Sequence, residues 1–189
     1  IGFEKFVTEL LNRRQPVYRQ RPERRLVLGY TSDNAPVFLD PLMLVDSRIG
    51  IIGSSRSGKS WLAGLITEEL HKKGYQFCII DPEGDYRGVA SSTHSILVNV
   101  TDEHVPAVSE LINFFEWHGA SMVVDLSMYN SDLRQPFLVD LLYNLRGLRQ
   151  RRGRPHWLLI DEVQGFCPPE GGKLTDLLLE SMHEGLGVG

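Results

Sequence analysis

Short apolar runs that lack polar alternation are the strongest feature of the chain. They occur at residues 49–52, 77–80, 122–126 and 157–160. Strands that are apolar on both faces are typical of parallel sheets covered by helices on both sides. The pattern therefore predicts an α/β fold with a mostly parallel central sheet.

The segments between and after these runs carry apolar residues at helical spacing. Each set can form one buried helix face, and the sets lie at 62–70, 105–115, 138–148 and 174–182. Gly74 and Gly119 are helix stop signals, whereas Ser131 starts the third helix, with Pro136 in or near its first turn. Strands are therefore expected to alternate with helices along most of the chain.

The N-terminal part follows a different pattern. Residues 1–25 begin with helical spacing and become rich in Arg, Gln and Pro, which predicts a short helix and a basic connector. Residues 26–30 and 36–39 are predicted to form a hairpin, because the residues at 32–34 favour a turn. We therefore expect a lead-in followed by one core over residues 26–189.

Composition limits the class of protein. The 189 residues are 42% hydrophobic, which is enough for one substantial core. No apolar run is long enough to span a membrane, so we expect a cytoplasmic protein with no membrane segment in this chain. Cys78 and Cys167 lie far apart without a CxxC pair, which argues against a zinc site or a disulfide scaffold.

Charge is distributed unevenly along the chain. The net charge is -4, but the first 25 residues hold 7 basic and 3 acidic side chains, which is +4 against -8 for the remainder. Another basic cluster precedes the last apolar run and consists of Arg146, Arg149, Arg151, Arg152 and Arg154. Either cluster could contact nucleic acid or a partner; the alternatives are a solvated face and, for the arginines, a favourable helix C-terminus.

A phosphate-binding loop follows the first apolar run. It fits the pattern G-x-x-x-x-G-K-[ST] without a mismatch, between a predicted strand and an amphipathic helix. In such loops backbone N–H groups point at phosphates, and the helix N-terminus adds positive partial charge. Lys59 is expected to reach the β- and γ-phosphates, and Ser60 to bind Mg²⁺. The predicted nucleotide-binding residues are Gly53, Ser54, Ser55, Arg56, Ser57, Gly58, Lys59, Ser60 and Trp61.

Two carboxylates end the last apolar run. In a protein with a phosphate loop, Asp161 is the expected second residue for Mg²⁺, and Glu162 the expected general base for the attacking water. Lys59 and Glu162 are therefore the predicted catalytic residues. The glutamate, together with the lack of an Asn-Lys-x-Asp guanine motif, favours ATP over GTP as the substrate.

Residues 26 to 189 resemble the HerA/FtsK superfamily of ring-forming ATPases, most of all the HerA-type DNA translocases. The lead-in from Leu28 to Asp40, the segment Asp-Pro-Glu-Gly-Asp-Tyr at 81–86 and the block Asp-Glu-Val-Gln-Gly-Phe-Cys-Pro at 161–168 carry the likeness. The chain departs from the usual pattern at Asp85 and Gln164, where the superfamily often has Glu and His.

This resemblance implies a RecA-like P-loop NTPase of the additional-strand, catalytic-glutamate type. It also implies a hexameric ring that moves double-stranded DNA through its pore with ATP and Mg²⁺, and a possible nuclease partner. An arginine from the neighbouring subunit would complete each site, and none is assigned in this chain. Because a further core strand is usual after the acidic strand, we expect the core to continue past Gly189 and the C-terminal part to be missing here.

Three other interpretations stay open at this point. Asp161, Glu162 and Gln164 also resemble the Asp-Glu-x-Gln-Asp motif of two-lobed helicases, although Gly165 stands where the last Asp is expected. A conjugation or secretion ATPase of the same superfamily would energise protein transfer without moving DNA. A nucleotide-dependent assembly switch would bind ATP and turn it over slowly.

Overall fold

The core of the molecule is a four-stranded parallel sheet with the strand order β4-β5-β3-β6. The computed structural model describes residues 25–41, 48–168 and 170–183, so the predicted N-terminal helix lies outside the described residues. The strands are β3 (Phe77–Asp81), β4 (Ile96–Asn99), β5 (Met122–Asp125) and β6 (Trp157–Ile160). The predicted α/β fold with a mostly parallel sheet is confirmed.

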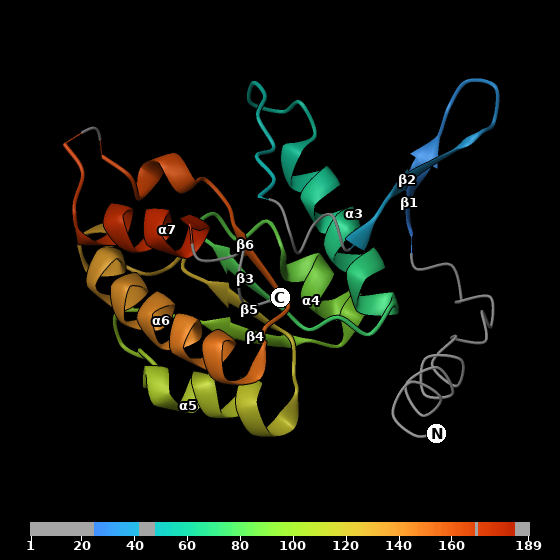
Figure 1. The fold of residues 1–189 in the computed structure, drawn as a ribbon. Coiled ribbons are helices and arrows are strands. Elements are labelled where there is room, and N and C mark those ends of the chain that lie inside the picture. The colour runs from blue at the N-terminus through green and yellow to red at the C-terminus, as the bar shows by residue number, and fades with distance from the viewer. Residues whose placement is uncertain (1–24, 42–47, 169, 184–189) are drawn as a thin grey trace, which may run out of the picture.

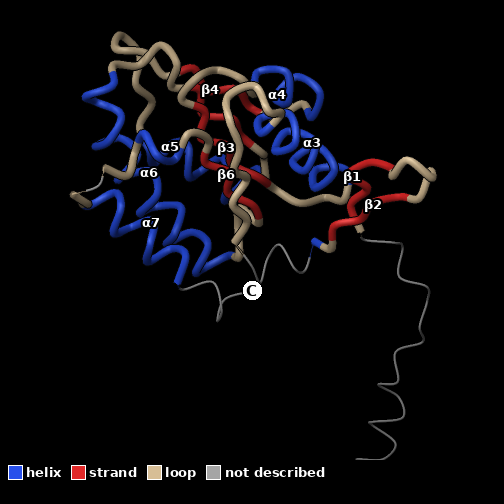
Figure 2. Tube along the Cα trace, turned by 90° about the horizontal axis from the view of Figure 1, so that it is seen from above, coloured by secondary structure: helices blue, strands red, loops and turns tan. Residues whose placement is uncertain are grey.

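Helices cover both faces of the sheet, as Figures 1 and 2 show. One face carries α3 (Lys59–Lys72) and α4 (Arg87–Thr93), and the other carries α5 (Val108–Asn113), α6 (Ser131–Arg152) and α7 (Lys173–His183). The central strands are buried on both sides, which explains their unbroken apolar runs.

The strand predicted over residues 49–52 is wrong. Residues 48–54 form no regular structure, and the side chain of Ile52 is 96% exposed, although Ile51 packs against the core. A strand needs a neighbour for its backbone N–H and C=O groups. Among the described residues β6 pairs with β3 alone, so no described strand offers this apolar run a partner.

The sequence patterns missed two short elements and misplaced the starts of two helices. β4 and α4 were not predicted, because a strand of four residues and a helix of seven carry little periodicity. The second predicted helix starts at Val108 rather than Val105 and continues as the π-helical turn η1 (Phe114–His118). Asn130, not Ser131, caps α6, because its side chain accepts a hydrogen bond from the Asp132 N–H, and Pro136 lies in the second turn.

The predicted hairpin is present as a separate two-stranded antiparallel sheet, β1 (Leu26–Tyr30) and β2 (Pro36–Leu39). Its turn includes Asn34 with φ 65°, a left-handed conformation that Asn tolerates. Leu26 is fully buried and packs with Ile66 and Leu70 of α3. The hairpin is therefore attached to the helix that follows the phosphate loop (Figure 1).

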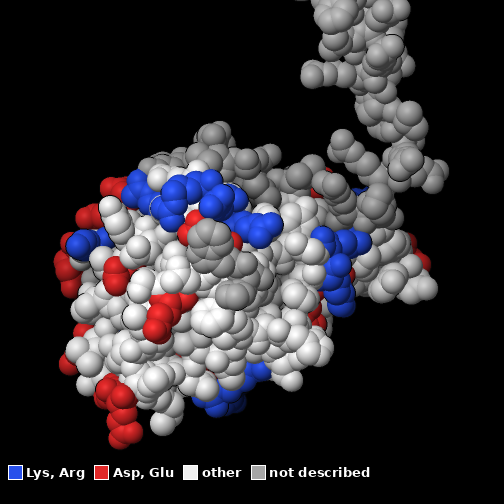
Figure 3. Space-filling view, turned by 90° about the horizontal axis from the view of Figure 1, so that it is seen from below, with Lys and Arg blue, Asp and Glu red and all other residues white. Residues whose placement is uncertain are grey.

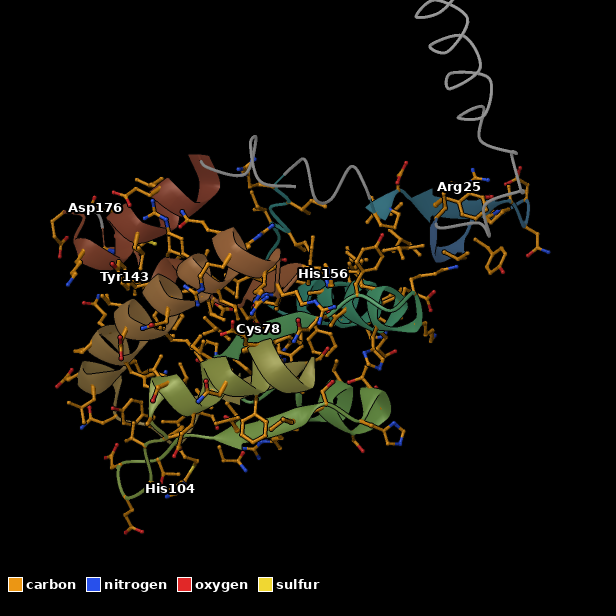
Figure 4. The ribbon with its side chains drawn as sticks, turned by 60° about the horizontal axis from the view of Figure 1, so that its bottom comes forward. Arg25, Cys78, His104, Tyr143, His156 and Asp176 are labelled. Atoms are coloured by element: carbon orange, nitrogen blue, oxygen red, sulfur yellow. The ribbon has the colours of Figure 1, made fainter. Side chains whose placement is uncertain are left out.

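Both cysteines are free, and Cys78 lies in the interior of the sheet (Figure 4). Burial raises the pKa of the Cys78 thiol to about 12, so the side chain behaves as an inert apolar residue. None of the described helices is long and apolar enough to cross a membrane.

Leu141→Ala on α6 should lower the free energy of unfolding by about 2–5 kcal/mol, because Leu141 is fully buried in the main core cluster. Urea denaturation measures this loss. The matched control is Leu133→Ala on the same helix, whose side chain is 47% exposed and whose loss should cost under about 1 kcal/mol. Equal losses for the two variants would contradict the assigned core face of α6.

Candidate nucleotide site

The phosphate loop leads directly into α3. Arg56 and Gly58 both have positive φ, 61° and 93°, and Gly58 is the N-cap residue of the helix. A Cβ atom at Gly53 would lie 2.5 Å from the Ser57 hydroxyl oxygen, so a larger residue there would force the Ser57 side chain to move. The conformation at Gly58 therefore favours glycine, and Gly53 leaves room for the Ser57 side chain.

The two ligand-type side chains of the loop point in different directions. The Lys59 ammonium group donates a hydrogen bond to the Ser54 carbonyl at 3.1 Å, so it lies over its own loop. The Ser60 hydroxyl oxygen lies 3.5 Å from Oδ2 of Asp161, although the two residues are 101 positions apart. Trp61, the last of the predicted nucleotide-binding residues, is 72% exposed. The structure thus brings Ser60 and Asp161 together as the sequence predicts.

Asp161 comes directly after β6, and its N–H donates to the Ile80 carbonyl of β3. Its Oδ1 accepts a hydrogen bond from the Glu162 N–H at 2.9 Å, whereas Oδ2 faces Ser60. The carboxylate is therefore oriented by the backbone, with one oxygen directed at the start of α3.

Glu162 is placed differently from the predicted convergence on the phosphate loop. It adopts φ 47°, which is strained for a non-glycine residue, and its carboxylate accepts a hydrogen bond from the Gln164 amide. It lines a cavity of about 400 Å³ together with residues from 82–83, 131–135 and 165–166. The structure brings Glu162 next to Asp161 but gives it no described contact with Lys59 or Ser60.

The segment at 81–86 forms a tight turn around one buried carboxylate. Asp81 is fully buried, and its two oxygens accept hydrogen bonds from the backbone N–H groups of Glu83, Gly84, Asp85 and Tyr86 at 2.7–3.3 Å. Burial raises the pKa of Asp81, and the charge of Asp125 adds to it, while the N–H donors of Tyr86, Gly84 and Asp85 oppose the rise. The buried Asp81 carboxylate therefore stabilises the turn that follows β3 through hydrogen bonds to its backbone.

The neighbouring strand end carries another carboxylate that sequence reasoning missed. Asp125 pairs with Asp81 in the parallel register, and its Oδ2 lies 2.6 Å from Nε of Arg87. Burial favours the neutral acid, but hydrogen bonds from Ser127 and Arg87 outweigh it and lower the pKa of Asp125. The signal was available, because Asp125 ends a buried apolar run just as Asp81 does.

Tyr86 also belongs to the site, and its role was not assigned from the sequence. The side chain is 1% exposed, and its hydroxyl makes no regular hydrogen bond with any described residue. Burial and the charge of Asp161 raise the pKa of Tyr86, while the nearby Ser60 hydroxyl opposes the rise. The Tyr86 hydroxyl therefore lies next to the Ser60–Asp161 pair.

These residues fit a magnesium nucleotide. Ser60 and Asp161 offer adjacent oxygen donors, which Mg²⁺ prefers, and the buried Tyr86 hydroxyl beside them is a further polar group. The described residues contain no group of three or more His, Cys, Asp and Glu side chains suited to a metal. A metal here would therefore take its other ligands from water and phosphate, as Mg²⁺ commonly does.

Comparisons with known proteins give one sequence match and one structural match. A family model described as the central domain of the helicase HerA matches residues 26–142. The solved structure of VirB4 from Thermoanaerobacter pseudethanolicus is similar in fold, with a TM-score of 0.58 and 14% identity, over 85% of this chain and 74% of that one. No curated protein is significantly similar to the chain.

The family match covers 117 of the 189 residues, counted from 26 to 142, and includes the phosphate loop and the turn at 81–86. Asp161 and Glu162 lie beyond the matched residues, so the family match does not extend to these two carboxylates. The chain belongs to the family of the HerA central domain, and it is a P-loop ATPase domain of the HerA/FtsK superfamily.

Proposed function

We propose that this chain is the ATP-hydrolysing motor domain of a hexameric, HerA-like DNA translocase. The observation that carries the proposal is the 3.5 Å approach of the Ser60 hydroxyl to Asp161. It brings the start of the phosphate-loop helix and the end of β6 to one point, which is the arrangement that a magnesium nucleotide requires. Substrate and metal are proposed to be ATP and Mg²⁺.

Each residue has a separate task in this proposal. The loop N–H groups and the N-terminus of α3 bind the phosphates, and Lys59 exchanges its bond to Ser54 for the β- and γ-phosphates. Ser60 and Asp161 hold Mg²⁺, which when bound neutralises charge on the β- and γ-phosphate oxygens. Glu162 accepts the proton of the attacking water as general base.

The general-base role requires a rearrangement of Glu162. Its carboxylate now accepts a hydrogen bond from Gln164 and faces the cavity beside the turn at 82–83. To take a proton from water at the γ-phosphate, the carboxylate has to leave Gln164. In this structure the base is therefore held away from the phosphate loop.

A basic surface supports the proposed DNA contact. Lys and Arg side chains gather in a band on the face shown in Figure 3. At the end of α6, Arg151 and Arg152 pair with Glu116, while burial and, to a lesser extent, the positive charge of Arg48 lower the pKa of Arg149. Repulsion between Arg48 and Arg149 lessens when an anion such as a phosphate group binds between them. The resemblance to HerA-type translocases adds three further parts to the proposal: a hexameric ring of subunits, double-stranded DNA in its pore, and a nuclease partner.

Lys59→Ala should weaken ATP binding by about 10- to 100-fold, because charge-assisted hydrogen bonds to the phosphates are lost. Binding of a fluorescent ATP analogue measures this change. The matched control is Lys72→Ala at the other end of α3, where the ammonium group pairs with Glu69. Unchanged affinity in the Lys59 variant would remove the phosphate loop from the site.

Glu162→Gln should retain ATP binding and lose turnover by about 100-fold or more, because the amide cannot accept the proton of water. Phosphate release measures turnover, and the same fluorescent analogue measures binding. Glu110→Gln on the exposed side of α5 serves as the control for loss of one carboxylate. Normal turnover in the Glu162 variant would refute its role as the base.

ATP turnover by the natural full-length protein should rise severalfold with double-stranded DNA. The stimulation should fade between about 50 and about 200 mM salt, because phosphate contacts release counterions. Arg149→Ala should reduce the stimulation without changing turnover in the absence of DNA. Equal turnover with and without DNA would instead favour the secretion ATPase or the assembly switch.

A further inference from the structure

The Tyr86 hydroxyl is a buried polar group of the described site that has no hydrogen-bond partner there and no task in the proposed mechanism. Its oxygen has under 1 Å² of exposed surface and no regular hydrogen bond among the described residues. A buried hydroxyl without a partner is unfavourable, so such a group points to a ligand, a water or a second conformation that satisfies it.

The backbone of Tyr86 is held firmly. Its N–H donates to Oδ2 of Asp81 at 2.9 Å, which is the last of the four N–H bonds to that carboxylate. Because Asp81 ends β3 at the centre of the sheet, the position of Tyr86 depends on the sheet itself and not on a loose loop.

The ring of Tyr86 is held as firmly as its backbone. It packs in a buried cluster with Ala63 of α3 and with Phe77 and Ile79 of β3. This packing leaves the aromatic ring little freedom, and its hydroxyl interacts with Asp161, Ser60 and, more weakly, the charge of Asp81. Core packing alone would be served by Phe, so the hydroxyl needs a separate explanation.

The chemistry of the neighbours indicates that explanation. Asp161 has one oxygen occupied by the Glu162 N–H, while the other faces Ser60 at 3.5 Å, which is the limit of a hydrogen bond. A phenol is a donor as well as an acceptor, whereas an ionised carboxylate only accepts. The Tyr86 phenol, which already interacts with Asp161 and Ser60, is therefore a hydrogen-bond donor available to the Asp161 oxygen that faces Ser60.

We propose that Tyr86 is a positioning residue of the metal site, whose hydroxyl donates a hydrogen bond to Asp161 when the magnesium nucleotide binds. The inference rests on the proposed function, since it assumes that Ser60 and Asp161 hold the metal. It makes the turn at 81–86 a link between the central strand and the nucleotide site.

The test is a Mg²⁺ titration of the binding of a fluorescent ATP analogue by the whole protein. Tyr86→Phe keeps the ring and removes the hydroxyl, and Tyr75→Phe, partly buried before the opposite end of β3, is the matched control. In Tyr86→Phe the Mg²⁺ concentration at half-saturation should rise about three- to tenfold, as expected for one lost hydrogen bond. Binding of the analogue without metal should stay unchanged.

The outcomes separate this inference from the proposed function. A Mg²⁺ midpoint in Tyr86→Phe within twofold of the wild-type value overturns the inference and leaves the function intact, as does a drop in melting temperature alone. If the wild-type protein binds the analogue equally well without Mg²⁺, or does not bind it, the proposed function itself fails.

A second measurement covers the case in which the Phe variant does not fold. Fluorotyrosine placed at position 86 of the otherwise natural chain reports on the hydroxyl environment by ¹⁹F NMR. Its resonance should shift with ATP and Mg²⁺ together and far less with ATP alone. Equal shifts under the two conditions overturn the inference.

Discussion

The structure depends on how three carboxylates are accommodated at one edge of a parallel sheet. Asp81, Asp125 and Asp161 end or follow adjacent strands, and the register aligns Asp81 with Asp125. Like charges this close disfavour one another, so each needs a partner of its own. Asp81 accepts hydrogen bonds from four backbone N–H groups, and Asp125 forms an ion pair with Arg87. One oxygen of Asp161 accepts a hydrogen bond from the Glu162 N–H, and the other faces the Ser60 hydroxyl. Asp161 is therefore the carboxylate with an oxygen left for a metal.

This edge is made rigid by the packing behind it. β3 is buried along its whole length between β5 and β6, and the fully buried residues of α6 close one face of the sheet. On the other face, α3 carries the phosphate loop and contacts the hairpin through Leu26. The nucleotide site is thus built where two rigid elements, the N-terminus of α3 and the end of β6, meet, and such placement favours precise geometry.

Glu162, the residue proposed to act as the general base, has a left-handed backbone conformation that is uncommon for a non-glycine residue. Glu162 combines a strained backbone with a hydrogen bond from Gln164 and an adjoining cavity of about 400 Å³. Strain of this kind persists where the surroundings hold it and often accompanies function. A base held by a neighbouring amide suits a motor in which hydrolysis has to wait for a signal, from DNA or from the adjoining subunit of the proposed ring.

The sequence by itself determined the parallel α/β sheet, the phosphate loop and the acidic strand end, because unbroken apolar runs and motif spacing are local properties. It also placed the hairpin and the main helices correctly, apart from their first turns. The tertiary structure alone decided three things: that residues 49–52 are not paired, that Glu162 turns toward Gln164, and that Tyr86 reaches Ser60 and Asp161. Each of these depends on which neighbour lies across the fold, and no pattern along one chain carries that information.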